Sequence, residues 1–127
     1  MPGQLIRISC VSELADEVVA GYDAPFPTPE SKAGVLAFPE LVPTEADHPS
    51  APKMLEVRAA LERWDKPALV LFSDSDPIFS TVAAEHMASR IPGAGPAEIV
   101  ASAGHFLQEE KGEEIAERIV RFMAETA

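Results

Sequence analysis

The chain of 127 residues is poor in basic residues and in cysteine, and it has no long hydrophobic run. Only 10 residues are Lys or Arg against 21 Asp or Glu, which gives a formal net charge of -11. An acidic surface repels nucleic acid and anionic membranes, so we expect neither as a partner. No hydrophobic run approaches the roughly 20 residues of a membrane-spanning helix, and the first ten residues lack the pattern of a signal peptide.

The single cysteine, Cys10, cannot form a disulfide within the chain, which favours a reducing compartment. We therefore expect a cytoplasmic protein. Hydrophobic residues make up 46% of the chain and charged residues 24%, a composition typical of a folded domain. His48 is expected in a loop and His86 on a solvated helix face, and no cluster has the spacing of metal ligands. We expect no metal and no cofactor.

Proline divides the chain, because nine of the twelve prolines lie between Pro2 and Pro67. This first half predicts short helices joined by stiff turns. One helix, with Ser12 as its N-cap, is expected to place four side chains on one face: Leu14, Val18, Val19 and Tyr22. A second begins at Thr28 and ends before Pro39. A third carries a hydrophobic stripe of Met54, Val57, Leu61 and Trp64.

The second half has the alternating pattern of strands and helices that is typical of an α/β fold. The continuous hydrophobic run 68–72 and the shorter run 98–101 predict two buried parallel strands. Helices follow each strand, with hydrophobic faces made by Val82, Met87 and Ile91 and by Ile115, Ile119, Phe122 and Met123. Two parallel strands make too small a sheet to stand alone. We expect a homodimer in which two copies pair their edges or exchange helices.

Reacting groups in open α/β sheets lie in the loops that follow the carboxyl ends of the strands. Here those loops contain the segments Ser73–Pro77 and Ser102–Phe106. Neighbouring strands would bring Asp76 and His105 together at one rim, in the order acid then histidine with which hydrolase triads of this kind finish. Histidine takes a proton from water near neutral pH, and a carboxylate fixes its tautomer. Gly104 is expected to let the backbone turn sharply beside the imidazole.

At these residues the sequence resembles haloalkane dehalogenases, a family of α/β-hydrolases. The segment AGHFLQEE, residues 103–110, is similar to their histidine loop, and DSDPI, residues 74–78, is similar to their acid loop. GYDAPFP, residues 21–27, and KAGVLAFPELVP, residues 32–43, resemble the end of their helical cap and the return to the core. The resemblance covers roughly residues 10 to 125.

The resemblance implies a partial α/β-hydrolase fold that corresponds to the C-terminal part of such an enzyme. Residues 1–50 would be a helical segment derived from the cap and residues 51–127 the β-α-β-α part of the core, packed together as one domain. His105 would be the catalytic base and Asp76 its partner. In the family an aspartate displaces halide to give an alkyl-enzyme ester, which water activated by the histidine then hydrolyses. A tryptophan that grips the halide would fall near Cys10, whereas the only tryptophan of this chain is Trp64.

The nucleophile of such an enzyme lies on an elbow of the form G-x-S-x-G or G-x-D-x-G, and neither pattern occurs in the 127 residues. The expected state is therefore a truncated hydrolase, inactive as an isolated chain. A residual esterase-like activity through His105, and a role as a dimeric small-molecule-binding or interaction module, are the alternatives. Binding to a separate N-terminal hydrolase half is another.

Two other interpretations concern the acid loop and the acidic C-terminal region. Asp74 could replace Asp76 as the acid, and the D-x-D spacing also resembles the magnesium-binding motif of haloacid-dehalogenase-like phosphatases. That fold has the motif near its N-terminus and needs a downstream lysine, whereas Lys111 is the only lysine after Asp76. The glutamates between Glu109 and Glu117 are expected to form a solvated helix start.

Overall fold

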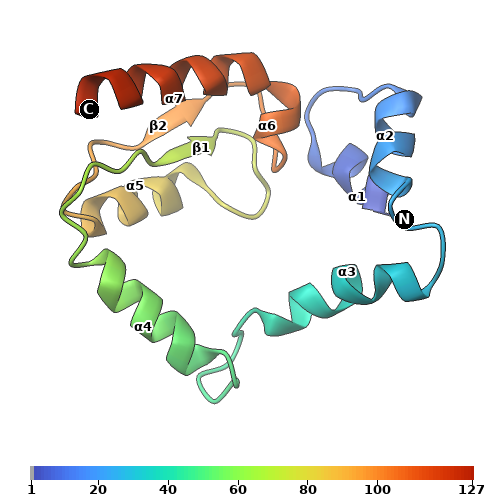
Figure 1. Cartoon of the computed structure of the whole chain (residues 1–127), viewed down its shortest axis with the longest axis horizontal. Coiled ribbons are helices and arrows are strands. Elements are labelled where there is room, and N and C mark those ends of the chain that lie inside the picture. The colour runs from blue at the N-terminus through green and yellow to red at the C-terminus, as the bar shows by residue number, and fades with distance from the viewer. Residues whose placement is uncertain (1) are drawn as a thin grey trace.

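The computed structural model describes residues 2–127, in which short helices surround a pair of parallel strands. The helices of the first half are α1 (Pro2–Ser9), α2 (Asp16–Asp23), η1 (Glu30–Lys32), α3 (Ala33–Ala37), η2 (Phe38–Leu41) and α4 (Ala51–Leu61). The second half consists of β1 (Leu71–Ser73), α5 (Thr81–Arg90), β2 (Glu98–Val100), α6 (Leu107–Glu110) and α7 (Gly112–Thr126). Figure 1 shows an open ring in which α3 and α4 lie opposite α7, α6 lies on the side of α1 and α2, and the C-terminal end of α7 lies far from α1. No helix in residues 2–127 is long and apolar enough to cross a bilayer.

The sheet confirms the predicted parallel pair. Phe72 lies opposite Ile99, and an isolated parallel bridge joins Ala68 to Ala94 just before the strands proper. Both figures show α7 and α5 on opposite sides of the two strands. This arrangement is the three-layer architecture that buries a parallel sheet on both faces.

The first predicted helix forms, but its start differs from the prediction. The helix α2 begins at Asp16 after Ala15, and Ser12 does not cap it, because the Ser12 hydroxyl donates to Glu110 instead. The predicted face nevertheless packs, since Leu14 and Val19 are buried together with Ile6. The helix α1 was not predicted, because residues 2–9 offer only a brief hydrophobic stretch. It crosses α2 at Gly3, whose amide donates to the Asp23 carboxylate (2.8 Å).

The prediction for the second helix is confirmed in outline. Thr28 opens it by accepting a hydrogen bond from the Ser31 amide (3.3 Å). The α-helical part α3 ends at Ala37, before Pro39, which lies in the first turn of the 3-10 helix η2. A proline in the first turn of a helix loses no backbone hydrogen bond, so the turn can follow directly.

Several hydrophobic faces lie in a different place from the one expected. On α4, Met54 and Val57 stay 49% and 42% exposed. On α5 the buried face is Ala84 and Ala88, whereas Val82 is 69% exposed. The hydrophobic cluster beneath α5 contains Val70 of the strand run, Ala88 and Ile91. Other apolar side chains stay exposed as well, among them Leu55 of α4 (62%) and Val120 and Met123 of α7 (66% and 63%).

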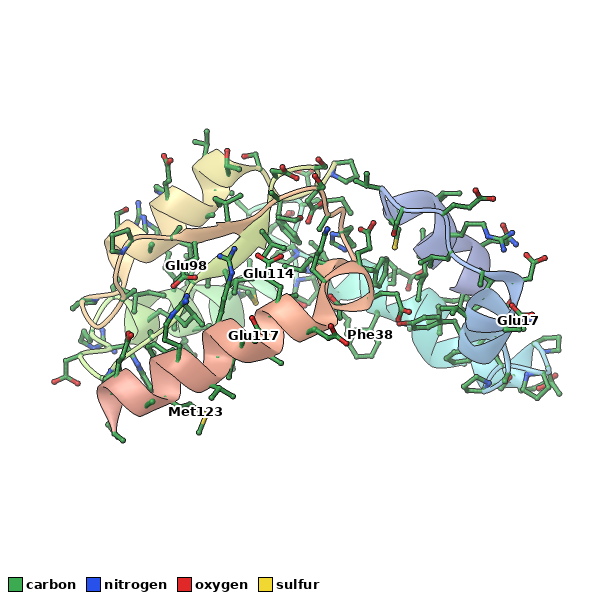
Figure 2. The ribbon with its side chains drawn as sticks, turned by 90° about the horizontal axis from the view of Figure 1, so that it is seen from above. Glu17, Phe38, Glu98, Glu114, Glu117 and Met123 are labelled. Atoms are coloured by element: carbon green, nitrogen blue, oxygen red, sulfur yellow. The ribbon has the colours of Figure 1, made fainter. Side chains whose placement is uncertain are left out.

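The outer edge of β2 is covered by a side chain of α7. Arg118 donates to the Ile99 carbonyl (3.2 Å) and pairs with Glu98 (3.1 Å) and with Glu114. Figure 2 shows Glu98 and Glu114 in the space between β2 and α7 that this guanidinium occupies. Arg118 therefore lies against the sheet edge, because the free carbonyl of Ile99 offers it an acceptor.

Candidate functional site

The structure brings Asp76 and His105 into direct contact at the carboxyl end of the strands. Asp76 lies in the loop between β1 and α5, and His105 in the loop between β2 and α6. The Nδ1 atom of His105 is 2.9 Å from Oδ2 of Asp76. The Asp76 side chain is only 6% exposed, whereas the imidazole keeps 26% of its surface accessible. Water can therefore reach the ring but hardly the carboxylate.

The second oxygen of Asp76 is held by backbone amides. Oδ1 accepts hydrogen bonds from the amides of Ile78 (2.7 Å) and Phe79 (3.1 Å). Burial by itself would raise the pKa of Asp76, but the hydrogen bonds from His105, Ile78 and Phe79 together hold this pKa below its ordinary value. Asp76 is therefore an anion near neutral pH, and an anionic carboxylate can only accept hydrogen bonds.

This geometry decides which imidazole nitrogen carries the proton and which carries the lone pair. Because Asp76 can only accept, Nδ1 of His105 must carry the proton, and the lone pair of the neutral ring lies on Nε2. Two phenyl rings frame the imidazole: Phe106 packs edge-on with centroids 5.2 Å apart, and Phe79 lies at 5.7 Å with its plane tilted by 31°. The histidine is thus fixed in tautomer by the carboxylate and in orientation by its neighbours.

Asp74 has a different role from Asp76, so it does not serve as the acid of the pair. Its carboxylate accepts hydrogen bonds from the amide of Ser102 (3.0 Å), the hydroxyl of Ser75 (2.9 Å) and the amide of Ala103 (3.4 Å). The hydrogen bond from Ser102 contributes most to lowering the pKa of Asp74. Ser102 has a φ of 55°, a conformation that L-residues rarely adopt, and the Asp74 carboxylate holds it there.

The two carboxylates therefore do not converge on a shared cation as the D-x-D alternative requires. Across residues 2–127, no three His, Cys, Asp or Glu side chains gather as the ligands of a metal ion would. His86 lies on the exposed side of α5, where Nε2 accepts from Arg90 (2.9 Å). His48 lies in a loop between η2 and α4, bonded to backbone atoms of Glu40 and Ser50. Both placements agree with the sequence prediction.

Glu110 links the histidine loop to the start of the chain, and its role was missed from the sequence. Oε1 accepts from the amides of Val11 (2.9 Å) and Ser12 (2.6 Å), and from the Ser12 hydroxyl (2.7 Å). Oε2 accepts from the Gly104 amide (2.6 Å), next to His105. Burial by itself would raise the pKa of Glu110, but these donors together lower it. The expectation of a solvated helix start is wrong for this glutamate, because four hydrogen-bond donors of residues 11, 12 and 104 hold its carboxylate.

A glycine is required at position 104 because another part of the backbone lies close to it, not because the chain turns there. Its φ is not left-handed, contrary to the reason expected from the sequence. A Cβ placed on it would lie 2.3 Å from the Ser9 carbonyl oxygen and 3.1 Å from Cα of Cys10. The same Ser9 carbonyl accepts the His105 amide (2.8 Å), and the Gly104 carbonyl accepts the hydroxyl of Ser73 (2.7 Å). The histidine loop is therefore held from both sides by backbone contacts.

Comparison with known proteins identifies the fold around this pair. No family model matches the chain. Haloalkane dehalogenase 1 of Mycobacterium tuberculosis is 42% identical over 125 residues, which cover 98% of this chain and 41% of the relative. A haloalkane dehalogenase of Psychrobacter cryohalolentis is 39% identical over 124 residues, which cover 95% of this chain and 40% of the relative. The chain is a homologue of haloalkane dehalogenases.

Solved structures extend this homology to the backbone. The crystal structure of a putative ancestral haloalkane dehalogenase matches 97% of this chain with a TM-score of 0.89 at 30% identity, and that match covers 43% of its length. The dehalogenase DatA from Agrobacterium tumefaciens matches 98% of the chain with a TM-score of 0.83 at 25% identity. This homologue is thus a partial α/β-hydrolase that spans about two fifths of the curated relatives it matches.

The dehalogenase homologue departs from the expected site at one position. Cys10, where the resemblance places a halide-gripping tryptophan, is half-buried against the cluster of Ile6, Leu14 and Val19. Burial is the main cause that raises the pKa of its thiol, and the charges of Glu110 and Glu109 add to it. Trp64 lies beyond the end of α4 and is 45% exposed.

Proposed function

We propose that His105 and Asp76 form the water-activating pair of a haloalkane dehalogenase-like hydrolase, and that the chain is not catalytic by itself. The observation that carries this proposal is the 2.9 Å contact between Nδ1 of His105 and the anionic Asp76. It leaves Nε2 as a base that water can approach. The homology to haloalkane dehalogenases supports the same roles.

In the proposed reaction, a carboxylate nucleophile from outside residues 1–127 first displaces halide and forms an alkyl ester. A water molecule then loses a proton to Nε2 of His105 while its oxygen attacks the ester carbonyl carbon. The ester C–O bond breaks, the alcohol takes the proton from His105, and the nucleophile returns as a carboxylate after it releases the remaining proton of the water to solvent. Asp76 stabilises the imidazolium that exists between the two proton transfers. Haloalkanes or esters are the proposed substrates.

The absence of an elbow motif from the sequence explains why the isolated chain is expected to be inactive. Residues of a catalytic triad act as a unit, and removal of the nucleophile alone suppresses turnover about as strongly as removal of all three triad residues. Without the nucleophile no ester intermediate forms, so a water molecule activated by His105 has no ester to hydrolyse.

Two measurements test this proposal. Halide release from a bromoalkane and hydrolysis of an activated ester by the chain alone should equal the buffer rate, for the wild type and for His105→Ala alike. When the unmatched part of the Mycobacterium tuberculosis relative supplies a nucleophile, halide release should appear and fall at least 100-fold with His105→Ala. His86→Ala is the matched control and should leave the rate unchanged. Turnover by the chain alone that depends on His105 contradicts the proposal and favours a residual esterase-like activity.

An interaction module is a second candidate, favoured by the apolar side chains that stay exposed on α4 and α7. Met54, Leu55 and Met123 are 49%, 62% and 63% exposed. Exposed patches of this kind mark binding surfaces in soluble proteins. A homodimer, as expected from the sequence, would use them. A light-scattering mass of one chain at micromolar concentration excludes that form.

A further inference from the structure

The outer edge of β1 carries backbone groups that are free to bind another strand. The Glu98 amide donates to the Val70 carbonyl (2.9 Å), and the Asp74 amide donates to the Val100 carbonyl (3.1 Å). In a parallel ladder alternate residues bond to the same neighbour, so Leu71 and Ser73 direct their amides and carbonyls to the opposite edge. In residues 2–127 the sheet has two strands and no strand pairs with that edge; Ser73 is 2% exposed, so the accessible groups of the edge are those of Leu71.

The outer edge of β2 differs from the edge of β1. The Ile99 carbonyl there already accepts Arg118, and Arg121 adds a second charge beside Glu98 (3.6 Å). Charged side chains of this kind are a common protection of sheet edges against pairing. The sheet therefore has one closed edge and one open edge.

The open edge continues into an apolar groove between the strand and α7. The groove has a volume of about 690 Å³. Its walls include Leu69 and Leu71 from the strand run, and Ile115, Ile119 and Met123 from α7. In Figure 2 Met123 points away from β2, on the open side of the helix. No residue of α7 is buried, although the helix has a strongly hydrophobic face.

We propose that the β1 edge and this groove bind the remaining part of an α/β-hydrolase core, which adds a strand parallel to β1. The backbone of this chain follows the ancestral dehalogenase with a TM-score of 0.89, yet the match covers only 43% of that protein. This chain keeps the backbone shape of that relative, and its apolar groove continues past the edge of β1. The edge and the groove therefore fit the surface on which the rest of the relative packs. The proposal rests on the proposed function, since the same remainder supplies the nucleophile.

The test combines the full chain with the unmatched remainder of Haloalkane dehalogenase 1 from Mycobacterium tuberculosis, by co-expression and by mixing. Light scattering should give the mass of a one-to-one complex. Hydrogen exchange at the Leu71 amide should be fast in the chain alone and at least tenfold slower in the complex. Docking is read from mass and exchange, so it is judged separately from catalysis. A complex without halide release dependent on His105 supports the docking and refutes the proposed function.

Two pairs of variants locate the binding surface. Leu71→Pro removes the outward amide and should weaken the complex at least tenfold, whereas Ile99→Pro removes an amide on the closed edge and should not. Leu71→Lys keeps the backbone but puts a charge into the groove, and should also weaken the complex. Its control is Val120→Lys, because Val120 is 66% exposed and does not line the groove. Circular dichroism checks that each variant folds.

Several results would overturn the proposal. Slow exchange at the Leu71 amide in a monomeric chain shows that the edge is not free, and this measurement needs no partner. A homodimer whose mass is lost in Leu71→Lys assigns the surface to a second copy. The proposal is also refuted if the unmatched part of the relative precipitates equally with and without the chain. The same holds if neither Leu71→Pro nor Leu71→Lys weakens the complex.

Discussion

Replacement of Glu110 by glutamine tests whether one carboxylate holds the histidine loop. The glutamine carbonyl can still accept from Val11 and Ser12 at the Oε1 position. Its amide group then faces the Gly104 amide, which loses its acceptor at 2.6 Å. In the variant two N–H donors face each other, whereas in the wild type the Gly104 amide faces a carboxylate oxygen.

The size of the effect follows from these contacts. A hydrogen bond to a charged group contributes about 1.5–3 kcal/mol, and a buried donor without a partner is similarly unfavourable. Since water reaches part of this site, we expect Glu110→Gln to lower the free energy of unfolding by about 2 kcal/mol. For a chain of this length that corresponds to a decrease in Tm of about 8 °C. Urea unfolding at pH 7, followed by circular dichroism, measures the change.

Glu109→Gln is the matched control on the same helical turn. Glu109 accepts one hydrogen bond, from the Tyr22 hydroxyl (2.6 Å), and glutamine can still accept it. The control should therefore change stability much less. Equal effects of the two substitutions would refute the proposed role of Glu110.

The lowered pKa of Glu110 gives the effect a pH signature. A carboxylate with a depressed pKa contributes stability that is present above its unfolded pKa of about 4.3 and is lost as pH falls through the folded value. The difference between wild type and Glu110→Gln should thus be full at pH 7 and shrink below about pH 4. A difference that is constant down to pH 3 would contradict the electrostatic explanation.

Three further predictions concern the same loops. Gly104→Ala forces a Cβ to 2.3 Å from the Ser9 oxygen and should destabilise by about 3 kcal/mol or more, whereas Gly112→Ala, with open space around it, should not destabilise; thermal unfolding compares them. Ser73→Ala removes the donor to the Gly104 carbonyl at a residue that is 2% exposed, and should lower the free energy of urea unfolding by about 1–2 kcal/mol. Because the pKa of Asp76 is lowered, the wild type should lose stability as pH falls below about 4, and Asp76→Asn should lose less in the same acid titration.

The strands and the acid–histidine pair could be predicted because their signals are local. The run 68–72 is continuously hydrophobic, and Asp76 and His105 each follow a predicted strand, so the parallel topology alone brings them to one rim. The choice between Asp74 and Asp76 could not be made from spacing. It depends on which carboxylate meets the backbone amides of residues 102 and 103 and which meets the imidazole.

The wrong expectations share a physical cause, which is a partner that is distant in sequence or lies outside the chain. Glu110 looks solvated in the sequence because its donors Val11 and Ser12 are 99 and 98 residues away. Arg118 looks solvated because nothing in a helical pattern shows the free carbonyl of Ile99. Met54 and Val82 look like core residues, since hydrophobic periodicity shows which face avoids water but not whether anything covers it.

The contacts of Glu110 also set an order in which the chain folds. The crossing of α1 and α2 and the pairing of the strands join residues only about 20 to 30 positions apart, as in the bonds of Gly3 with Asp23 and of Ser73 with Gly104. The bonds from residues 11 and 12 to Glu110 require a loop of nearly the whole chain to close, and such closures carry the largest entropy cost. The backbone around His105 is therefore expected to reach its final form after both halves have folded. Substitutions there should then accelerate unfolding more than they slow folding.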